Sequence, residues 1–125
     1  MGLDCSHDAF SGAYSAFMRF RIAVAEATGG RWDEKEGFFY FGEGYDSVSH
    51  PGLYEFMGHS DCDGVITPEM CARVADDLEA LIPELGKKGL GAGHLLRDGG
   101  YAAVAERFIK GCREAAAANE SLEFH

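Results

Sequence analysis

Apolar residues recur at helical spacing in three stretches of the chain, and these stretches predict three main helices. The first covers residues 7–28 and is followed by Gly29, a residue that commonly ends helices. The second covers residues 67–85, and it starts with Thr67 followed by a proline, a favourable pair for an N-cap and a first helical turn. The third covers residues 98–118.

The stretch between the first two helices has a different character. Residues 31–45 place a charged turn before the aromatic run FFYF, which predicts one or two short extended segments or an ordered loop. Apolar residues at 53–57 predict a short helix or turn that packs on the core. The pattern as a whole predicts a mostly α fold, with three to four helices in one compact domain (residues 1–125), an irregular aromatic-rich middle segment and room for a minor β element.

Composition and charge narrow the class of protein. The chain has 125 residues, of which 46% are hydrophobic and 26% charged, which is typical of a single globular domain rather than a disordered chain. Eleven Lys and Arg against 21 Asp and Glu give a net charge of −10. Nucleic acids and anionic membranes bind dense basic surfaces, so we expect neither as a partner. Arg19 and Arg21 are expected at the surface of the first helix.

We expect a cytoplasmic protein with reduced thiols. The chain begins without the basic and apolar segments of a secretory signal, and its apolar runs are far shorter than a membrane span. Four cysteines, at positions 5, 62, 71 and 112, lack the spacing of a disulfide framework. Cys71 and Cys112 lie on apolar helical stripes, where a thiol behaves as a small hydrophobic group, while Cys5 and Cys62 lie in polar segments.

The most polar segment, residues 59–69, allows a calcium loop or a simple turn. Asp61, Asp63 and Gly64 match three positions of the calcium-binding loop. The first ligand position holds His59 and the last holds Met70, so two expected oxygen ligands are missing. An Asp–Gly turn that leads into the following helix uses the same residues.

A transition metal is a second interpretation of the polar segments. Thiolates, imidazoles and carboxylates are the groups that hold Zn or another divalent metal. The candidate ligands are Cys5, His7, His59, Asp61, Cys62 and Asp63. The alternative is that residues 4–8 form only a capped helix start, and that His59 ends a short helix.

An anion site is a third interpretation. Residues 86–100 (GKKGLGAGHLLRDGG) combine glycines, which allow close backbone approach, with cationic side chains. The segment lacks the spacing of a phosphate-binding loop, so a solvated hinge is the alternative. The aromatic run at 38–41 and Tyr45 are suited to stack on a ring or to fill a small core, and Arg31 and Trp32 are candidates for the wall of a ligand site. The chain has no nucleophile-elbow motif for a serine hydrolase.

Three fragments carry a resemblance to a known group of proteins. They are GLDCSHDAF with the following GAYSAFMRFR, the stretch that begins HSDCDG, and the terminal LEFH. The chain resembles small uncharacterised proteins of bacteriophages, prophages and their bacterial hosts over nearly its whole length. It looks shortened between Phe41 and Leu53. The resemblance implies a role inside an infected bacterial cell, such as counter-defence by capture of a nucleotide signal.

We therefore expect a non-enzymatic binding protein for a small anionic or nucleotide-type ligand, built as a homo-oligomer. The residues expected to line its pocket are His7, Trp32, His59, His94 and Arg97. Two alternatives stay open. One is a metal-dependent hydrolase that uses the His, Asp and Cys cluster, and the other is an inhibitor that binds a host protein through an exposed apolar patch.

Overall fold

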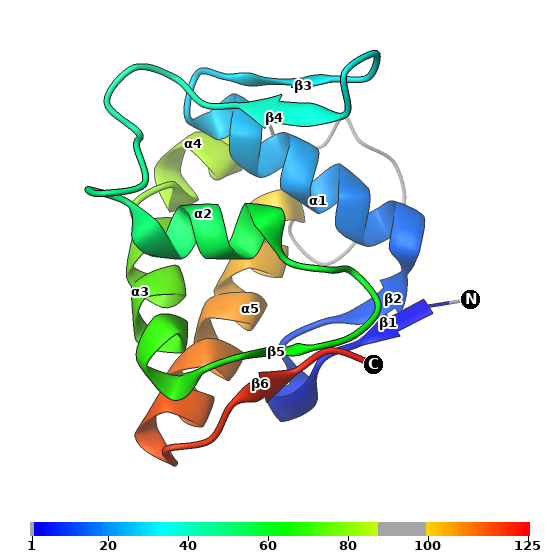
Figure 1. Cartoon of the computed structure of the whole chain (residues 1–125), viewed down its shortest axis with the longest axis vertical. Coiled ribbons are helices and arrows are strands. Elements are labelled where there is room, and N and C mark those ends of the chain that lie inside the picture. Colours follow the sequence, from blue (N-terminus) through cyan, green and yellow to red (C-terminus); the bar gives the residue numbers. More distant parts are fainter. Residues whose placement is uncertain (1, 88–99) are drawn as a thin grey trace.

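The computed structural model describes residues 2–87 and 100–125. This part of the chain contains five α-helices and three short antiparallel strand pairs (Figure 1). The helices are α1 (Tyr14–Ala27), α2 (Pro51–Gly58), α3 (Pro68–Glu79), α4 (Ile82–Lys87) and α5 (Gly100–Ala117). The strand pairs are β1 (Gly2–Asp4) with β2 (Ser11–Ala13), β3 (Arg31–Asp33) with β4 (Phe38–Tyr40), and β5 (Val65–Ile66) with β6 (Leu122–Glu123). The predicted mostly α fold with a minor β element is confirmed.

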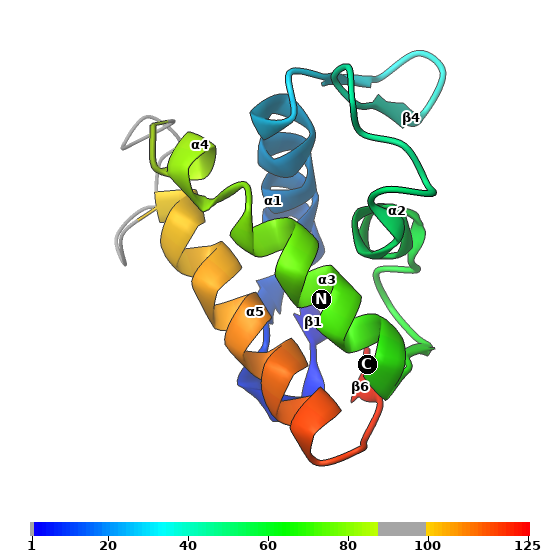
Figure 2. The same cartoon turned by 90° about the vertical axis from the view of Figure 1, so that its left-hand side faces the viewer.

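The helices pack in a bundle whose central contact is between α3 and α5. Figure 2 shows these two helices side by side, with α1 behind them and α2 on the opposite side of α3 from α5. Gly52 permits the close crossing of α2 over α3, because a Cβ at this position would lie 2.3 Å from the backbone of Arg73. The side chain of Asp77 on α3 accepts a hydrogen bond from the backbone N–H of Leu53 and so fixes the start of α2.

Aromatic rings fill the centre of the fold. Phe17 and Phe20 of α1 meet Phe56 of α2 and Phe108 of α5, with ring centroids 5.0 to 6.3 Å apart. All four side chains are fully buried. Edge-to-face contacts of this kind add to the free energy gained by burying the ring area. The phenylalanines therefore hold the three helices together.

The first helix begins later than the sequence predicts, at Tyr14 rather than at residue 7. His7 and Asp8 both have φ near 56°, which an α-helix excludes, and they form the bend between β1 and β2. Phe10 is nonetheless buried, since the bend folds its ring onto Phe17 at 4.9 Å. The prediction of a helix start at residue 7 was wrong because the buried residues of this folded-back loop have the same spacing as those of a helix.

The second predicted helix is two helices. Its start is confirmed, because Thr67 Oγ1 accepts a hydrogen bond from the backbone N–H of Met70. Pro83 has no N–H to donate to the carbonyl of Glu79. The helix α3 therefore ends at Glu79, and α4 begins at Ile82. The third helix is confirmed over Gly100–Ala117, and residues 98 and 99 lie outside the described part.

The two ends of the described chain lie side by side (Figure 1). Asp4 and His125 exchange two backbone hydrogen bonds of 3.1 and 2.8 Å, and a β-bridge joins Cys5 to Phe124. Phe124 also donates its backbone N–H to the carbonyl of Gly64. No helix in the described residues has the length and apolarity needed to cross a membrane.

Candidate functional site

A cleft of about 490 Å³ lies between α1, α2 and the β3–β4 hairpin. Aromatic side chains dominate its walls: Trp32, Phe38, Phe39, Phe41 and Tyr54. Met18 and Met57 add further apolar surface, and Arg21 and His59 add polar groups. Two of the five residues predicted to contact a ligand, Trp32 and His59, therefore line one cleft. A concave, largely apolar surface with a few polar groups is typical of a small-molecule site.

Arg21 is the main charged group of the cleft. Its side chain is only 7% exposed, and its guanidinium lies over the rings of Phe17 and Phe56, 4.6 and 5.6 Å from their centroids. Nη2 donates a hydrogen bond to the backbone carbonyl of His59, whereas the buried Nε has no acceptor among the described residues. Burial lowers the pKa of Arg21 to about 10. The negative charge of Asp61 acts in the other direction and raises this pKa, but by less. The cleft therefore contains a buried cation with unused hydrogen-bonding capacity.

The prediction that Arg21 lies at the surface is wrong, while Arg19 is exposed as expected. Helix geometry explains the difference. Residue 21 lies one turn from both Phe17 and Val24, on the buried stripe of α1, and residue 19 lies off that stripe. The position of Arg21 four residues after the apolar Phe17 was the signal in the sequence that could have indicated its burial.

Two pairs of contacting rings shape the aromatic wall, one tilted and one edge-to-face. The rings of Trp32 and Phe39 lie opposite each other in the β3–β4 register, with centroids 4.6 Å apart. Phe41 contacts Tyr54 of α2 at 4.8 Å, which joins the end of the hairpin to the second helix. Phe38 is 61% exposed at the rim. A planar ring is the ligand shape that such walls favour.

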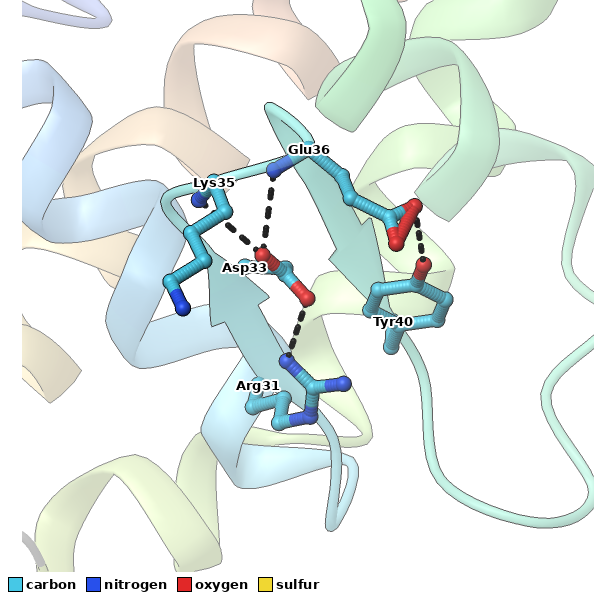
Figure 3. Close-up of polar contacts among 5 residues, drawn as sticks. All are labelled: Arg31, Asp33, Lys35, Glu36 and Tyr40. Carbon is cyan, nitrogen blue, oxygen red and sulfur yellow. Dashed lines mark hydrogen bonds and ion pairs between the residues drawn. The ribbon is translucent and has the colours of Figure 1, made fainter.

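The outer face of the hairpin satisfies its own charges (Figure 3). Asp33 accepts hydrogen bonds from the backbone N–H groups of Lys35 and Glu36 and from Arg31 Nη1, at 3.0 to 3.1 Å. The hydrogen bond from Glu36 N–H and the contact with Arg31 lower the pKa of Asp33. The Tyr40 hydroxyl donates to Glu36, and Arg31 lies over the Tyr40 ring. This network orders the turn that carries Trp32 and Phe39.

A tight contact fixes the hairpin to the end of α1. Thr28 Oγ1 donates to the carbonyl of Ala25 and accepts a hydrogen bond from the backbone N–H of Gly42. Gly42 is required here, because a Cβ at this position would lie 1.7 Å from the carbonyl oxygen of Thr28. The aromatic wall is therefore held at a defined distance from Arg21.

His59 contributes its backbone to the cleft more than its ring nitrogens. Nδ1 lies 2.8 Å from the carbonyl of Ser60, and Nε2 lies 3.0 Å from the carbonyl of Val65. The ring also stacks on Phe124, with centroids 4.2 Å apart. The backbone carbonyl of His59 accepts the hydrogen bond from Arg21. His59 thus orients the guanidinium and connects the cleft to the C-terminal strand.

The other predicted ligand residues lie elsewhere or outside the described part of the chain. His7 Nε2 lies 3.0 Å from a carboxylate oxygen of Glu120, and His7 lines a separate groove with α5. The structure therefore does not bring His7 to the Trp32 and His59 cleft. His94 and Arg97 lie outside the described residues, as does most of the glycine-rich segment 86–100.

The six candidate metal ligands do not form one coordination site. Among residues 2–87 and 100–125, no three His, Cys, Asp or Glu side chains are placed to hold a metal ion together. Burial, followed by the charge of Asp4, raises the pKa of Cys5 to about 12, which disfavours the thiolate that a metal needs. Both ring nitrogens of His59 face carbonyl groups, and His7 pairs with Glu120. Asp61, Cys62 and Asp63 lie exposed on the 59–64 turn.

The three fragments that carry the resemblance nevertheless meet in space. Cys5 of the first fragment pairs with Phe124 of the last, and Phe124 stacks on His59 of the second. Ser6 Oγ accepts a hydrogen bond from the backbone N–H of Glu123. These residues build one corner of the fold, next to the cleft, through ring contacts and backbone hydrogen bonds.

A larger groove of about 560 Å³ runs between α3, α4 and α5. Its charged groups include Glu79 and Arg113, which bind each other at 2.9 Å, while Arg113 also contacts Asp76. These ion pairs are exposed, so water competes for the charges. The hairpin cleft is the stronger candidate, because its cation is buried and one of its N–H groups has no acceptor in the described part of the chain.

Comparison of the chain with protein-family models, with curated proteins and with solved structures found no match. The assignment of the site therefore depends on its geometry.

Proposed function

We propose that this protein captures a small anionic ligand with a planar ring in the cleft between α1, α2 and the β3–β4 hairpin. The observation that carries the proposal is the position of Arg21, a buried cation that lines an aromatic cleft and whose Nε–H has no acceptor among the described residues. A carboxylate or phosphate oxygen would pair with the guanidinium, and the walls around Trp32 and Phe39 would stack on the ring.

A binding role fits this site better than catalysis. The walls are mainly aromatic and methionine side chains, and the His59 ring nitrogens face backbone carbonyls rather than a free position for proton transfer. The cleft is built from one chain, so the proposal does not depend on the homo-oligomer expected from the sequence. Within the bacteriophage context of the resemblance, a nucleotide-type signal is the corresponding ligand class.

Trp32 offers a direct test, since it is the only tryptophan of the chain and lines the cleft. We expect cyclic nucleotide monophosphates or aromatic acids, titrated to about 100 µM, to change its fluorescence. Arg21→Met should remove the response, because it keeps the length of the side chain and removes its charge. Arg19→Met is the matched control: it lies two positions away on α1, is exposed, and should leave the response unchanged. Equal responses of both variants would contradict the proposal.

A further inference from the structure

We infer that the cleft selects ligands with one negative charge beside a planar ring, so that a cyclic phosphodiester or an aromatic carboxylate binds and a multiply charged phosphate is rejected. This inference rests on the proposed function and names its ligand class. The two sources share one chemistry, a single delocalised anion with two oxygens, and the experiment below separates them.

The first observation is the number of cations in the cleft. Arg21 is the only Lys or Arg side chain among the described residues that line it. Arg31, a cation of the hairpin, points its guanidinium to Asp33 and the Tyr40 ring on the outer face (Figure 3). The His59 ring has both nitrogens within 3.0 Å of carbonyl oxygens. One guanidinium can neutralise one unit of negative charge, and no second guanidinium or ammonium group lines the cleft among the described residues.

The second observation is the negative field around this cation. The protein has a net charge of −10, and the charge of Asp61 already acts on Arg21. A second negative charge on the ligand would be partly desolvated against aromatic walls, where an unpaired charge is strongly unfavourable. Repulsion from the acidic surface adds to this penalty. The electrostatics therefore favour a monoanion.

The third observation is the shape of the donor group and of the space beside it. A guanidinium presents parallel N–H groups that match the two free oxygens of a phosphodiester or a carboxylate. Trp32 and Phe39 line the same cleft, with their ring centroids 4.6 Å apart. The volume of about 490 Å³ falls within the usual range for small-molecule sites. A ligand with one planar ring and one adjacent anionic group would contact both the guanidinium and the aromatic pair.

The experiment is a set of Trp32 fluorescence titrations on the full chain. The probes are 3′,5′-cyclic AMP, 5′-AMP, ADP and ATP, which share the adenine ring and differ in charge, together with neutral adenosine. Indole-3-acetate and benzoate form the carboxylate arm. We expect cyclic AMP or an aromatic carboxylate to bind at least about tenfold more tightly than ADP, ATP and adenosine, and calorimetry should confirm the order of affinity.

Variants of Arg21 separate the inference from the proposed function. Arg21→Met should bring the affinity for the monoanion down to that for adenosine, and Arg21→Lys, which keeps the charge without the planar fork, should give an intermediate value. Tighter binding of ADP or ATP, still dependent on Arg21, would overturn the charge selection and leave the proposed function standing. Adenosine binding as tightly as cyclic AMP would overturn the inference as well. No response to any probe would overturn both.

Discussion

Arg21, in the middle of α1, donates a hydrogen bond to the backbone carbonyl of His59, 38 residues later and directly after α2. This bond joins the two sides of the aromatic cleft. It also couples the cleft to the corner where the chain ends meet, since the ring of His59 stacks on Phe124. Arg21 therefore combines a candidate binding role with a structural position.

We predict that Arg21→Met keeps or raises the stability of the protein. Burial lowers the pKa of Arg21 from its usual value to about 10, so the folded state disfavours its charged form. The corresponding cost is about 3 kcal/mol. It is fully present below pH 10 and disappears as the pH rises toward the usual pKa. The cation–π contacts with Phe17 and Phe56 offset part of it.

Urea unfolding at pH 7 measures this effect. We expect the free energy of unfolding of Arg21→Met to equal or exceed that of the parent protein, because a methionine can fill the site without a buried charge. Arg19→Met, at an exposed position, should stay within about 0.5 kcal/mol. A loss of more than about 1 kcal/mol in Arg21→Met would show that the hydrogen bond to His59 outweighs desolvation.

Local signals in the sequence were sufficient for much of the fold. Thr67 and Pro68 predicted the start of α3, and the apolar stripe of residues 100–117 predicted α5. The aromatic run at 38–41 predicted an extended segment, and β4 occupies most of it. Each of these features depends on neighbours within one or two turns, so periodicity and capping rules apply directly.

Long-range contacts could not be predicted in the same way. The burial of Phe10 depends on left-handed residues His7 and Asp8, and nothing in their types requires φ near 56°. Trp32 and His59 were predicted to line a pocket and do line the cleft, but Arg21 was predicted to be exposed. The hydrogen bond between Arg21 and His59 joins segments that only the tertiary fold brings together.

We predict that Phe124→Ala destabilises the protein by about 3–5 kcal/mol. Phe124 is 2% exposed and packs against Phe17, Phe108 and the His59 ring. The truncation leaves a cavity and removes the stack that orients His59, so ligand binding in the cleft should weaken too. Urea unfolding gives the stability, with Val48→Ala, at a 90% exposed position, as the control. A loss below about 1 kcal/mol would mean that the C-terminal strand is not docked as described.

We predict that Gly42→Ala disturbs the aromatic wall. The new Cβ would lie 1.7 Å from the carbonyl oxygen of Thr28, and backbone on both sides has to move to relieve this clash. We expect a loss of about 1–3 kcal/mol and a shift in Trp32 fluorescence without ligand. Gly86→Ala is the matched control, because its Cβ would meet no atom of the described residues within 4 Å and Ala favours the helix α4. Equal behaviour of the two variants would contradict the tight contact between Gly42 and Thr28.

We predict that Cys5 makes the protein less stable as the solution becomes alkaline. The side chain is 6% exposed, and burial raises the pKa of its thiol from 9.0 to about 12, with a smaller effect from Asp4. Between these values the unfolded state loses the thiol proton while the folded state keeps it. The contribution of the Cys5 thiol to the free energy of unfolding is therefore fully present below pH 9 and is lost as the pH rises toward 12. From pH 8 to pH 10 this one group should lower the free energy of unfolding by roughly 1.4 kcal/mol.

The measurement compares urea unfolding of the parent protein and of Cys5→Ala at pH 8 and pH 10 under reducing conditions. Cys5→Ala should lose less stability between the two pH values than the parent, by the same roughly 1.4 kcal/mol. The pKa of the buried Cys112 is also raised, by its contact with Cys71 and by burial, but Cys112 is present in both proteins and cancels in the comparison. Cys62→Ala removes an exposed thiol and should follow the parent. If Cys5→Ala also follows the parent, Cys5 is accessible to water and the corner formed by the chain ends is more open than described.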